Sequence, residues 1–292
     1  MSKKLILPIF IYCLLYLIAN PLISRQIVVD TLRLWHQSVI PALFPTILLI
    51  QYYLLMQPVS CMPYFLAATI SIGCGFPIGT WITCKYGTIG KIKPGNVPIY
   101  CAMLNQFSPA FIQSYVGTTI LHSNPHKILF LYYCVMVFSA LVSYPIIKHW
   151  SAYESNRFIT LKETLPTIQE EQSFSKAILL SSEILLRLFG YMFLCNSIIT
   201  MLSSIKFLKT ITILISPLLE VTTGLIGYVT AYDATKQIPY IFAVLNFGGL
   251  SGCLQVIPVL KKDNYSIKCY LFSKCILMVT TYIITKLLIL FI

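Results

Sequence analysis

The sequence predicts an all-helical integral membrane protein, and its composition and its long apolar segments carry that prediction. Hydrophobic residues make up 57% of the 292 residues, charged residues make up 10%, and the mean hydropathy is +0.80. A soluble domain has about a quarter of its residues charged. Apolar stretches recur from Leu5 to the end of the sequence, and a membrane-crossing helix needs roughly 20 apolar residues. We therefore expect one membrane domain and no separate soluble domain.

The first apolar segment, Leu5–Ile23, follows Lys3 and Lys4 and has the general pattern of a signal peptide. Its apolar run is longer than the core of about 7–15 residues found in signal peptides, and no small-x-small cleavage pattern follows it. We therefore expect a retained first transmembrane helix. The further apolar segments are, in order, Leu34–Gln57, Pro63–Lys85, Pro98–Leu121, Ile128–Ile147, Ser175–Leu202, Leu208–Ala231, Ile238–Leu260 and Ile267–Ile292.

A polar stretch, Lys148–Gln172, divides these segments into two groups. It carries the acidic residues Glu154, Glu163, Glu170 and Glu171. This composition is typical of a solvated loop that has room for a short helix. The expected organisation is a transmembrane helix (1–29), a first repeat (30–147), a polar cytoplasmic loop (148–174) and a second repeat (175–292).

After the first helix, both groups have the same order: an ordinary span, two segments that are broken near the middle, and a last span. The breaks lie at residues 73–79, 105–109, 217–224 and 246–252. Interrupted segments at matching places in two halves indicate a transporter's binding site. Glycine and proline are also common in membrane helices in general, which is the alternative interpretation of any single break. The residues expected to interrupt the backbone are Gly75, Pro77, Gly79, Pro109, Gly224, Gly248 and Gly249.

The distribution of basic residues favours re-entrant hairpins for two of the broken segments. If every segment crossed the membrane, the basic residues would divide almost evenly between the two sides. If Pro63–Lys85 and Leu208–Ala231 are hairpins, the outer side keeps only Arg25, Arg33, Lys127, Lys206, Lys209 and Lys236 of the loop residues. Positive charge favours the cytoplasmic side, so the hairpin arrangement is preferred. It predicts about seven transmembrane helices plus two re-entrant helical hairpins, arranged as an inverted repeat.

Two Ser-Pro pairs lie at the breaks and have the pattern of a helix start. In Ser108-Pro109 the serine hydroxyl would cap the helix and the proline would fit its first position. Ser216-Pro217 repeats the arrangement and is equally compatible with an ordinary loop-to-helix junction. The amino end of a half-helix offers free amides and partial positive charge, which suits a carboxylate or another anionic group.

Glu220 is the most informative single residue of the sequence. An acidic side chain inside an apolar segment is costly and usually marks an ion path, a proton path or a substrate contact; structural pairing is the alternative. Other polar side chains at the breaks can donate or accept hydrogen bonds, either to a solute or between helices. The candidate substrate-binding residues are Asn105, Gln106, Ser108, Glu220, Thr222, Thr223, Asn246, Ser251 and Gln255.

Several other functions are disfavoured by the sequence. Ten cysteines without a Cys-x-x-Cys pair and four scattered histidines predict no metal site, and no motif predicts a cofactor or an enzyme's active site. The net charge of +12 fits basic loops at lipid headgroups, and the scattered basic residues predict no nucleic-acid surface. Glu183 and Arg187 are four residues apart, so we expect an ion pair on one helix face.

At the breaks the chain resembles the YlbJ (SpoVV) family of sporulation integral membrane proteins, which belongs to the nucleoside-recognition Gate group. Leu34-Trp35, Pro41 and Leu43-Phe44-Pro45 look like the family's early helix. The motif-bearing stretches are similar to Gly-aromatic-Pro-x-Gly at 75–79, Leu-Glu-Ile-Thr-x-Gly at 219–224 and Phe-Gly-Gly-Leu-Ser at 247–251, with Gln255 after the last. Residues 105–109 read Asn-Gln-Phe-Ser-Pro where the family often has Asn-Asn-Ser-Gly-Pro, and this substituted middle bears on which substrate is expected.

This resemblance, which covers roughly residues 30 to 290, implies a multi-pass bacterial membrane protein, in a forespore membrane, with a core similar to concentrative nucleoside transporters. It also implies movement of dipicolinate, a small aromatic dianion. The expected function is therefore alternating-access transport of a small aromatic anion or a nucleoside-like solute, with Glu220 as the candidate carrier of a coupling proton or cation. The alternative is a non-transporting membrane scaffold in which the polar loop matters more. The oligomeric state stays open.

Overall fold

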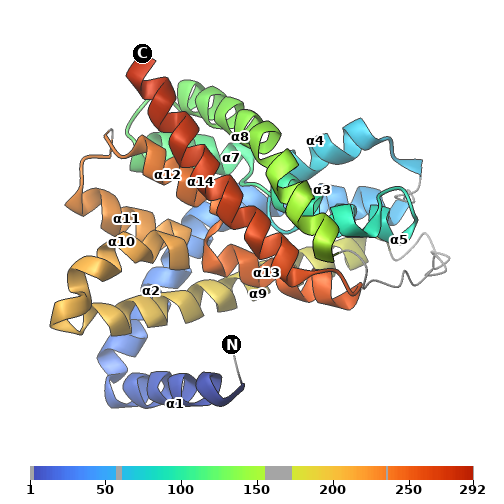
Figure 1. Cartoon of the computed structure of the whole chain (residues 1–292). Helices are drawn as coiled ribbons and strands as arrows, with labels where there is room; N and C mark the ends of the chain where they lie inside the picture. The colour runs from blue at the N-terminus through green and yellow to red at the C-terminus, as the bar shows by residue number, and fades with distance from the viewer. Residues whose placement is uncertain (1–2, 57–60, 155–172, 235, 292) are drawn as a thin grey trace.

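Every regular element of the described chain is a helix, as the sequence predicts (Figure 1). The computed structural model describes residues 3–56, 61–154, 173–234 and 236–291. Among these residues, five helices are long and apolar enough to cross a membrane: Pro21–Met56, Pro125–Ser151, Phe174–Ser203, Ile238–Lys262 and Ile267–Leu290. The described part of the chain is thus all-helical and has the long apolar helices of a membrane protein.

The amino-terminal helices differ from the predicted segments. α1 (Lys3–Ala19) ends before Asn20, and α2 (Pro21–Leu34) starts with proline at its first position. Proline disfavours helical geometry in the residue before it and fits the first turn of a new helix, so the predicted single segment Leu5–Ile23 is wrong at this point. α2 continues through the π-helical η1 (Trp35–Val39) into α3 (Ile40–Met56).

The two segments predicted to be hairpins each consist of a pair of short helices. The pairs are α4 (Tyr64–Cys74) with α5 (Ile78–Thr88), and α10 (Lys209–Leu219) with α11 (Val221–Ala231). Each of the four helices has 11 residues. An α-helix rises 1.5 Å per residue, so each helix is about 16 Å long, or half the roughly 30 Å hydrocarbon core.

Close contacts show that each pair folds back on itself. A Cβ atom on Gly79 would lie 3.2 Å from the Cβ atom of Ser71, and one on Gly224 would lie 2.4 Å from the backbone nitrogen of Pro217. Residues seven or eight positions apart in a straight helix are separated by about 11–12 Å along its axis. The chain therefore reverses between α4 and α5 and between α10 and α11, which makes each pair a helical hairpin.

The other two broken segments are also interrupted, but their close contacts do not require the chain to reverse. The first runs from η3 (Pro94–Asn96) through α6 (Val97–Leu104) and α7 (Pro109–Phe111) into the π-helical η4 (Ile112–Ile120). The second consists of α12 (Ile238–Phe247) and α13 (Gly249–Lys262). The predicted breaks are therefore present in all four segments.

Three long helices complete the described fold: α8 (Pro125–Glu154), α9 (Ser173–Ser203) and α14 (Ile267–Phe291), with the short η7 (Lys206–Leu208) after α9. α8 and α14 lie side by side in Figure 1, and the Ser143 and Thr280 hydroxyls are 2.8 Å apart between them. The predicted polar loop begins too early, because α8 continues past Lys148 to Glu154. The rest of that loop, including Glu163, Glu170 and Glu171, lies outside the described residues.

Two of the seven predicted spans have no counterpart among the five long apolar helices of the described residues. α1 has 17 residues, which is short of the roughly 20 that a span needs, and residues 98–121 are interrupted between α6 and α7. The described residues therefore show five long spans, two helical hairpins and shorter pieces.

The expected break residues fall into two groups. Gly75 ends α4 at φ +73° and Gly248 ends α12 at φ +89°, and both conformations favour glycine. Pro77 precedes α5, Pro109 begins α7 and Gly249 begins α13, so these residues also lie at the interruptions. Gly79 and Gly224 lie inside α5 and α11, where the lack of a side chain allows the hairpin helices to approach.

The prediction that Ser216-Pro217 starts a half-helix is wrong. Both residues lie inside α10, and the Ser216 hydroxyl donates back to the carbonyl of Ile213 at 3.2 Å. The helix start comes four residues later, where the Glu220 side chain caps α11 by accepting from the Thr223 amide. A carboxylate thus takes the capping role that the sequence pattern assigned to a serine.

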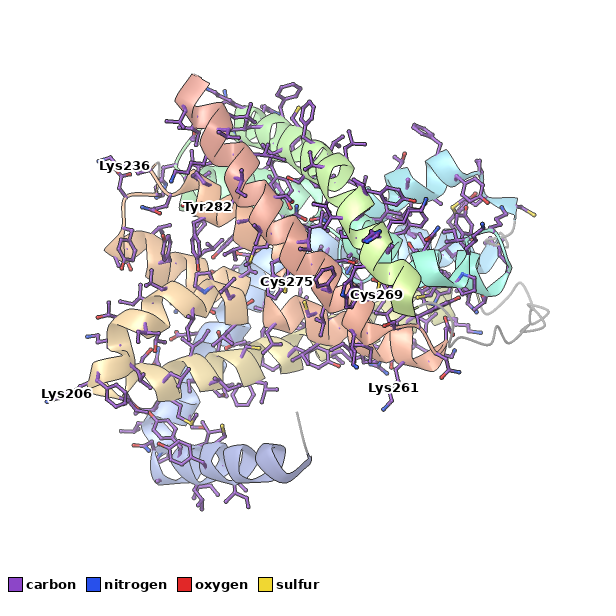
Figure 2. All side chains as sticks on the ribbon, viewed as in Figure 1. Lys206, Lys236, Lys261, Cys269, Cys275 and Tyr282 are labelled. Atoms are coloured by element: carbon purple, nitrogen blue, oxygen red, sulfur yellow. The ribbon has the colours of Figure 1, made fainter. Side chains whose placement is uncertain are left out.

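Apolar side chains cover much of the outer surface, and Phe65, Leu22, Phe207 and Leu290 are all more than two-thirds exposed. Lys206, Lys236 and Lys261 lie at the periphery of the molecule, near helix ends (Figure 2). Exposed apolar faces with charges at the helix ends are the arrangement that a bilayer stabilises.

We predict that Gly224→Ala destabilises the protein, whereas Gly227→Ala does not. The new methyl group at position 224 would overlap the backbone of Ser216 and Pro217, while the site of Gly227, in the same helix, has no atom within 4 Å. Overpacking costs about 1–3 kcal/mol, and alanine in an open helix position gains about 0.5–1 kcal/mol. Thermal unfolding of the purified variants measures both effects, and equal melting temperatures would contradict the hairpin contact.

Candidate functional site

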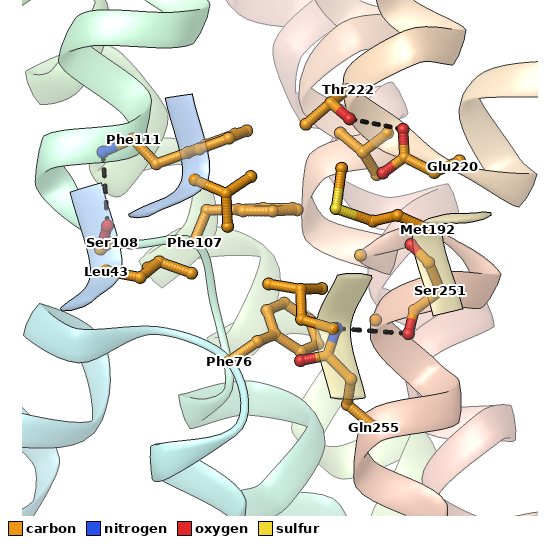
Figure 3. Close-up of a pocket in the computed structure, with 15 residues that line it drawn as sticks. Leu43, Phe76, Phe107, Ser108, Phe111, Met192, Glu220, Thr222, Ser251 and Gln255 are labelled. Atoms are coloured by element: carbon orange, nitrogen blue, oxygen red, sulfur yellow. Dashed lines mark hydrogen bonds between the residues drawn. The ribbon is translucent and has the colours of Figure 1, made fainter. Parts of the chain in front are cut away.

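A small cavity lies where the broken segments meet (Figure 3). Its volume is about 40 Å³, which has room for a few water molecules. Phe107 and Phe111 face Glu220, Met192 and Ser251 across it. The remaining lining residues come from the same interruptions and from the neighbouring helices: Val39, Leu43, Phe76, Ser108, Leu188, Val221, Thr222, Gly248, Gly252 and Gln255. All four breaks therefore contribute to one site.

Glu220 is the acidic group of the cavity. It has an extended backbone between α10 and α11 and is only 3% exposed. Its Oε2 accepts from the Thr222 hydroxyl at 2.5 Å and from the Thr223 amide at 2.7 Å. No salt bridge of the described residues involves Glu220. Hydrogen bonds and the amino end of α11 thus stabilise this carboxylate without a basic partner.

The Thr223 hydroxyl connects Glu220 to α9. It lies 2.7 Å from Glu220 Oε2 and also contacts the Asn196 side-chain oxygen, while Asn196 donates to the Thr31 hydroxyl at 2.9 Å. A hydroxyl has one proton, so Thr223 can donate to only one of its two acceptors at a time. A proton on Glu220 Oε2 would satisfy both contacts. Neither Asn196 nor Thr31 is among the predicted site residues. Asn196 is one of several polar residues in the apolar segment Ser175–Leu202, and Thr31 lies between two predicted segments, so neither carries a distinctive pattern.

Aromatic rings form the opposite wall of the cavity. The Phe107 ring stacks on Phe111 with centroids 4.7 Å apart, and it lies 5.4 Å from the ring of Phe76. Stacked and tilted rings at these separations are stabilising, and they offer flat apolar faces. Phe107 and Ser108 lie within residues 105–109, where the sequence departs from the motif of the family it resembles, so part of this departure falls in the lining of the cavity.

The predicted amides form a buried network behind the cavity. Gln106 Nε2 donates to Asn246 Oδ1 at 2.9 Å, and Asn246 Nδ2 donates to the Thr281 hydroxyl at 2.6 Å. The Tyr132 hydroxyl donates to Gln106 Oε1 at 3.2 Å. These side chains are almost fully buried and join two breaks to α8 and α14. Their observed contacts are therefore interhelical.

The nine predicted site residues thus divide by position. Ser108, Glu220, Thr222, Ser251 and Gln255 line the cavity, and Thr223 contacts Glu220 from behind it. Gln106 and Asn246 belong to the buried network, and the Asn105 side chain is buried with no hydrogen-bond partner among the described residues. Ser108 caps α7 by accepting from the Phe111 amide at 3.3 Å, as the Ser-Pro pattern predicts.

Lys274 is not among the predicted site residues, yet it lies in α14 with a completely buried side chain. Its Nζ donates to the carbonyl oxygens of Asn105 at 3.0 Å and Asn246 at 2.9 Å. A basic residue in the middle of an apolar span is a signal of the same kind as Glu220. Lys274 lies outside the four breaks, and Lys268 and Lys286 in the same segment make it less distinctive in the sequence.

A larger basic vestibule adjoins the cavity. Its volume is about 460 Å³ and its charged lining consists of Lys85, Arg187, Lys262 and Glu183. Glu183 pairs with Arg187 at 2.5 Å, which confirms the predicted ion pair, and both side chains are more than half exposed. Gln255 lines both spaces. Ser251, Gln255 and Lys262 lie at helical spacing on α13, so one face of this helix leads from the cavity to the vestibule.

The fold and the site together define a helical membrane protein whose interrupted helices surround a polar and aromatic cavity. Among the described residues, no cluster of three His, Cys, Asp or Glu side chains could hold a metal ion. Comparison of the chain with protein-family models, with curated proteins and with solved structures gave no match. The arrangement of this chain's own residues therefore has to carry any functional conclusion.

We predict that the Gln106 and Asn246 side chains are energetically coupled. Either single leucine substitution leaves a buried hydrogen-bond partner unpaired, at a cost of about 1–3 kcal/mol, whereas the double variant removes both partners. A double-mutant cycle of thermal or denaturant unfolding should give a coupling energy of about 0.5–3 kcal/mol. Strict additivity of Gln106→Leu and Asn246→Leu would contradict the network.

Proposed function

We propose that the protein is a secondary transporter of a small aromatic solute, either an anion of the dipicolinate type or a nucleoside-like molecule. The observation that carries the proposal is the convergence of four broken segments on one cavity that contains a buried carboxylate. Irregular backbone at membrane depth is tolerated where it is buried in protein or lines a cavity, and in transporters it forms the substrate site. The resemblance to the YlbJ family supports the same class of protein.

The two hairpins support an inverted-repeat topology. Each consists of two 11-residue helices, whose length suits half a bilayer, and each occupies the same place in its half of the chain. A hairpin returns to the side of the membrane on which it started. With two such hairpins, more basic loop residues fall on the cytoplasmic side, so the charge distribution of the sequence favours the same arrangement. Relative motion of the two halves would then expose the cavity alternately to each side.

The lining chemistry suits a flat solute with polar edges. Phe76, Phe107 and Phe111 offer ring faces, while Glu220, Ser251 and Gln255 offer hydrogen-bonding groups. A cavity that holds benzene measures about 150 Å³, so the space of about 40 Å³ corresponds to a closed state. Binding a ring requires Phe107 or a neighbouring helix to move.

Glu220 places a condition on an anionic solute. A buried carboxylate repels an anion at close range unless a proton or a cation neutralises it. An additional proton on Glu220 fits this role, because Glu220 could then donate to the Thr223 hydroxyl while that hydroxyl donates to Asn196. We therefore propose that Glu220 carries the coupling proton, and that the basic vestibule attracts the anion before it reaches the cavity.

The scaffold alternative depends on the polar loop, most of which lies outside the described residues. No observation on the described residues favours it over transport, whereas the cavity and its carboxylate favour transport.

We predict that Glu220→Gln uncouples transport from the proton gradient. The glutamine keeps the shape of a protonated glutamate but cannot release a proton, so exchange of labelled for unlabelled solute should persist. Accumulation driven by a pH gradient in liposomes should fall by at least about tenfold, within the usual range of coupling between two sites. Asp233→Asn, at an exposed acidic residue, is the control and should behave like the wild type. Unchanged gradient-driven accumulation in Glu220→Gln would refute the proton-carrier role.

We also predict that the vestibule selects for anions. At low ionic strength, Lys262→Glu should slow the initial uptake of dipicolinate by about two- to tenfold and leave uptake of a neutral nucleoside unchanged. Lys268→Glu, at an exposed lysine that does not line the vestibule, is the matched control. Equal slowing of both solutes would argue against electrostatic attraction.

A further inference from the structure

Lys274 has the most unusual surroundings of any charged residue in the described chain. Its side chain is completely buried in the protein, and it belongs to α14, which is long and apolar enough to cross a membrane. It lies seven residues after the start of α14, or about 10 Å from the end of that helix. A charged side chain at this depth is costly, so strong local interactions must compensate for its burial.

The Lys274 ammonium group contacts two carbonyl oxygens and the face of an aromatic ring, all of which are electron-rich. It donates to the carbonyl oxygens of Asn105 and Asn246 at 3.0 and 2.9 Å, and it lies 5.0 Å from the centre of the Phe76 ring. Ring faces attract cations. No carboxylate pairs with it in any salt bridge of the described residues. Two carbonyl groups and one ring therefore compensate the positive charge.

Both carbonyl groups lie at the carboxyl ends of broken helices. Asn105 follows the last residue of α6, and Asn246 lies in the last turn of α12. The final carbonyls of a helix have no partner within it and carry partial negative charge. Two such ends that meet at one point inside a membrane protein form an acceptor site for a monovalent cation, and carbonyls of unwound segments hold sodium in other transporters.

We propose that the ends of α6 and α12 form a monovalent-cation site that the ammonium group of Lys274 occupies as a tethered cation. The ammonium group neutralises the two helix ends, so the protein needs no bound sodium ion there. It also ties both halves of the chain to α14, since Asn105 belongs to the first half and Asn246 to the second. This inference does not depend on the identity of the solute or on transport itself.

The proposal can be tested by removing the tethered cation and supplying a free one. Lys274→Ala leaves the two carbonyls in place and opens space beside them. We expect its melting temperature to be lower than that of the wild type in choline chloride. It should rise by at least about 2 °C in sodium, ammonium or methylammonium chloride of equal ionic strength, because a ligand that binds the folded state stabilises it.

Two comparisons make the test specific. The melting temperature of the wild type should be the same in all four salts, because its site is filled. Lys286→Ala removes an exposed lysine of the same helix and should show no response to the cation. A cation response of equal size in Lys286→Ala or in the wild type would overturn the proposal.

A milder variant covers the case in which Lys274→Ala does not fold. Lys274→Gln keeps hydrogen-bond donors but removes the charge, so it should show the same ranking of salts with a smaller rise. A Lys274 variant that folds and melts at one temperature in all four salts would show that the carbonyl pair binds no cation. Solute uptake enters none of these readouts, so failure of this proposal and failure of the transport proposal are separate results.

Discussion

The constraint on which this structure depends is that broken helices inside a membrane must satisfy their free backbone groups internally. At α11, the Glu220 carboxylate accepts from the Thr223 amide of the first turn, which has no partner within the helix. At the ends of α6 and α12, the Lys274 ammonium group serves the free carbonyls of Asn105 and Asn246. One buried acid thus compensates an amino end and one buried base compensates two carboxyl ends. The carboxylate interacts with the amino end of a helix and the ammonium group with carboxyl ends, so neither charge needs the other as an ion-pair partner.

This division of roles also shapes the cavity. Because Lys274 is committed to backbone carbonyls, Glu220 remains the charged residue of the cavity wall. The ring of Phe76 contacts both regions: it lies over the Lys274 ammonium group and it lines the cavity. Gly248 permits this packing, because a side chain there would overlap the Phe76 ring at 2.3 Å. A solute that displaces the aromatic wall would therefore also disturb the point at which the two halves meet α14.

Much of the framework could be predicted from local sequence, and the reasons are physical. Glycine at residues 75, 248 and 249 permits a positive-φ backbone that other residues disfavour, and Pro77 fixes its own φ, so these breaks appear where the pattern places them. The prediction for Ser216-Pro217 was wrong because a Ser-Pro pair can also lie within the last turns of a helix. α10 continues through both residues and ends at Leu219. The long Pro21–Met56 helix was divided incorrectly, since a single proline sets a boundary that hydropathy alone does not show.

The sequence by itself determined the membrane class, the helical content and the location of the four breaks, because each of these follows from local composition and backbone preference. Only the tertiary structure decided which polar residues line the cavity and which form hydrogen bonds between helices in the interior. Ser108, Glu220 and Gln255 line the cavity, whereas Gln106 and Asn246 contact each other in the interior. Hydropathy and spacing cannot distinguish these two roles, because both require a polar residue in an apolar segment, and only the direction of packing against α8, α9 and α14 separates them.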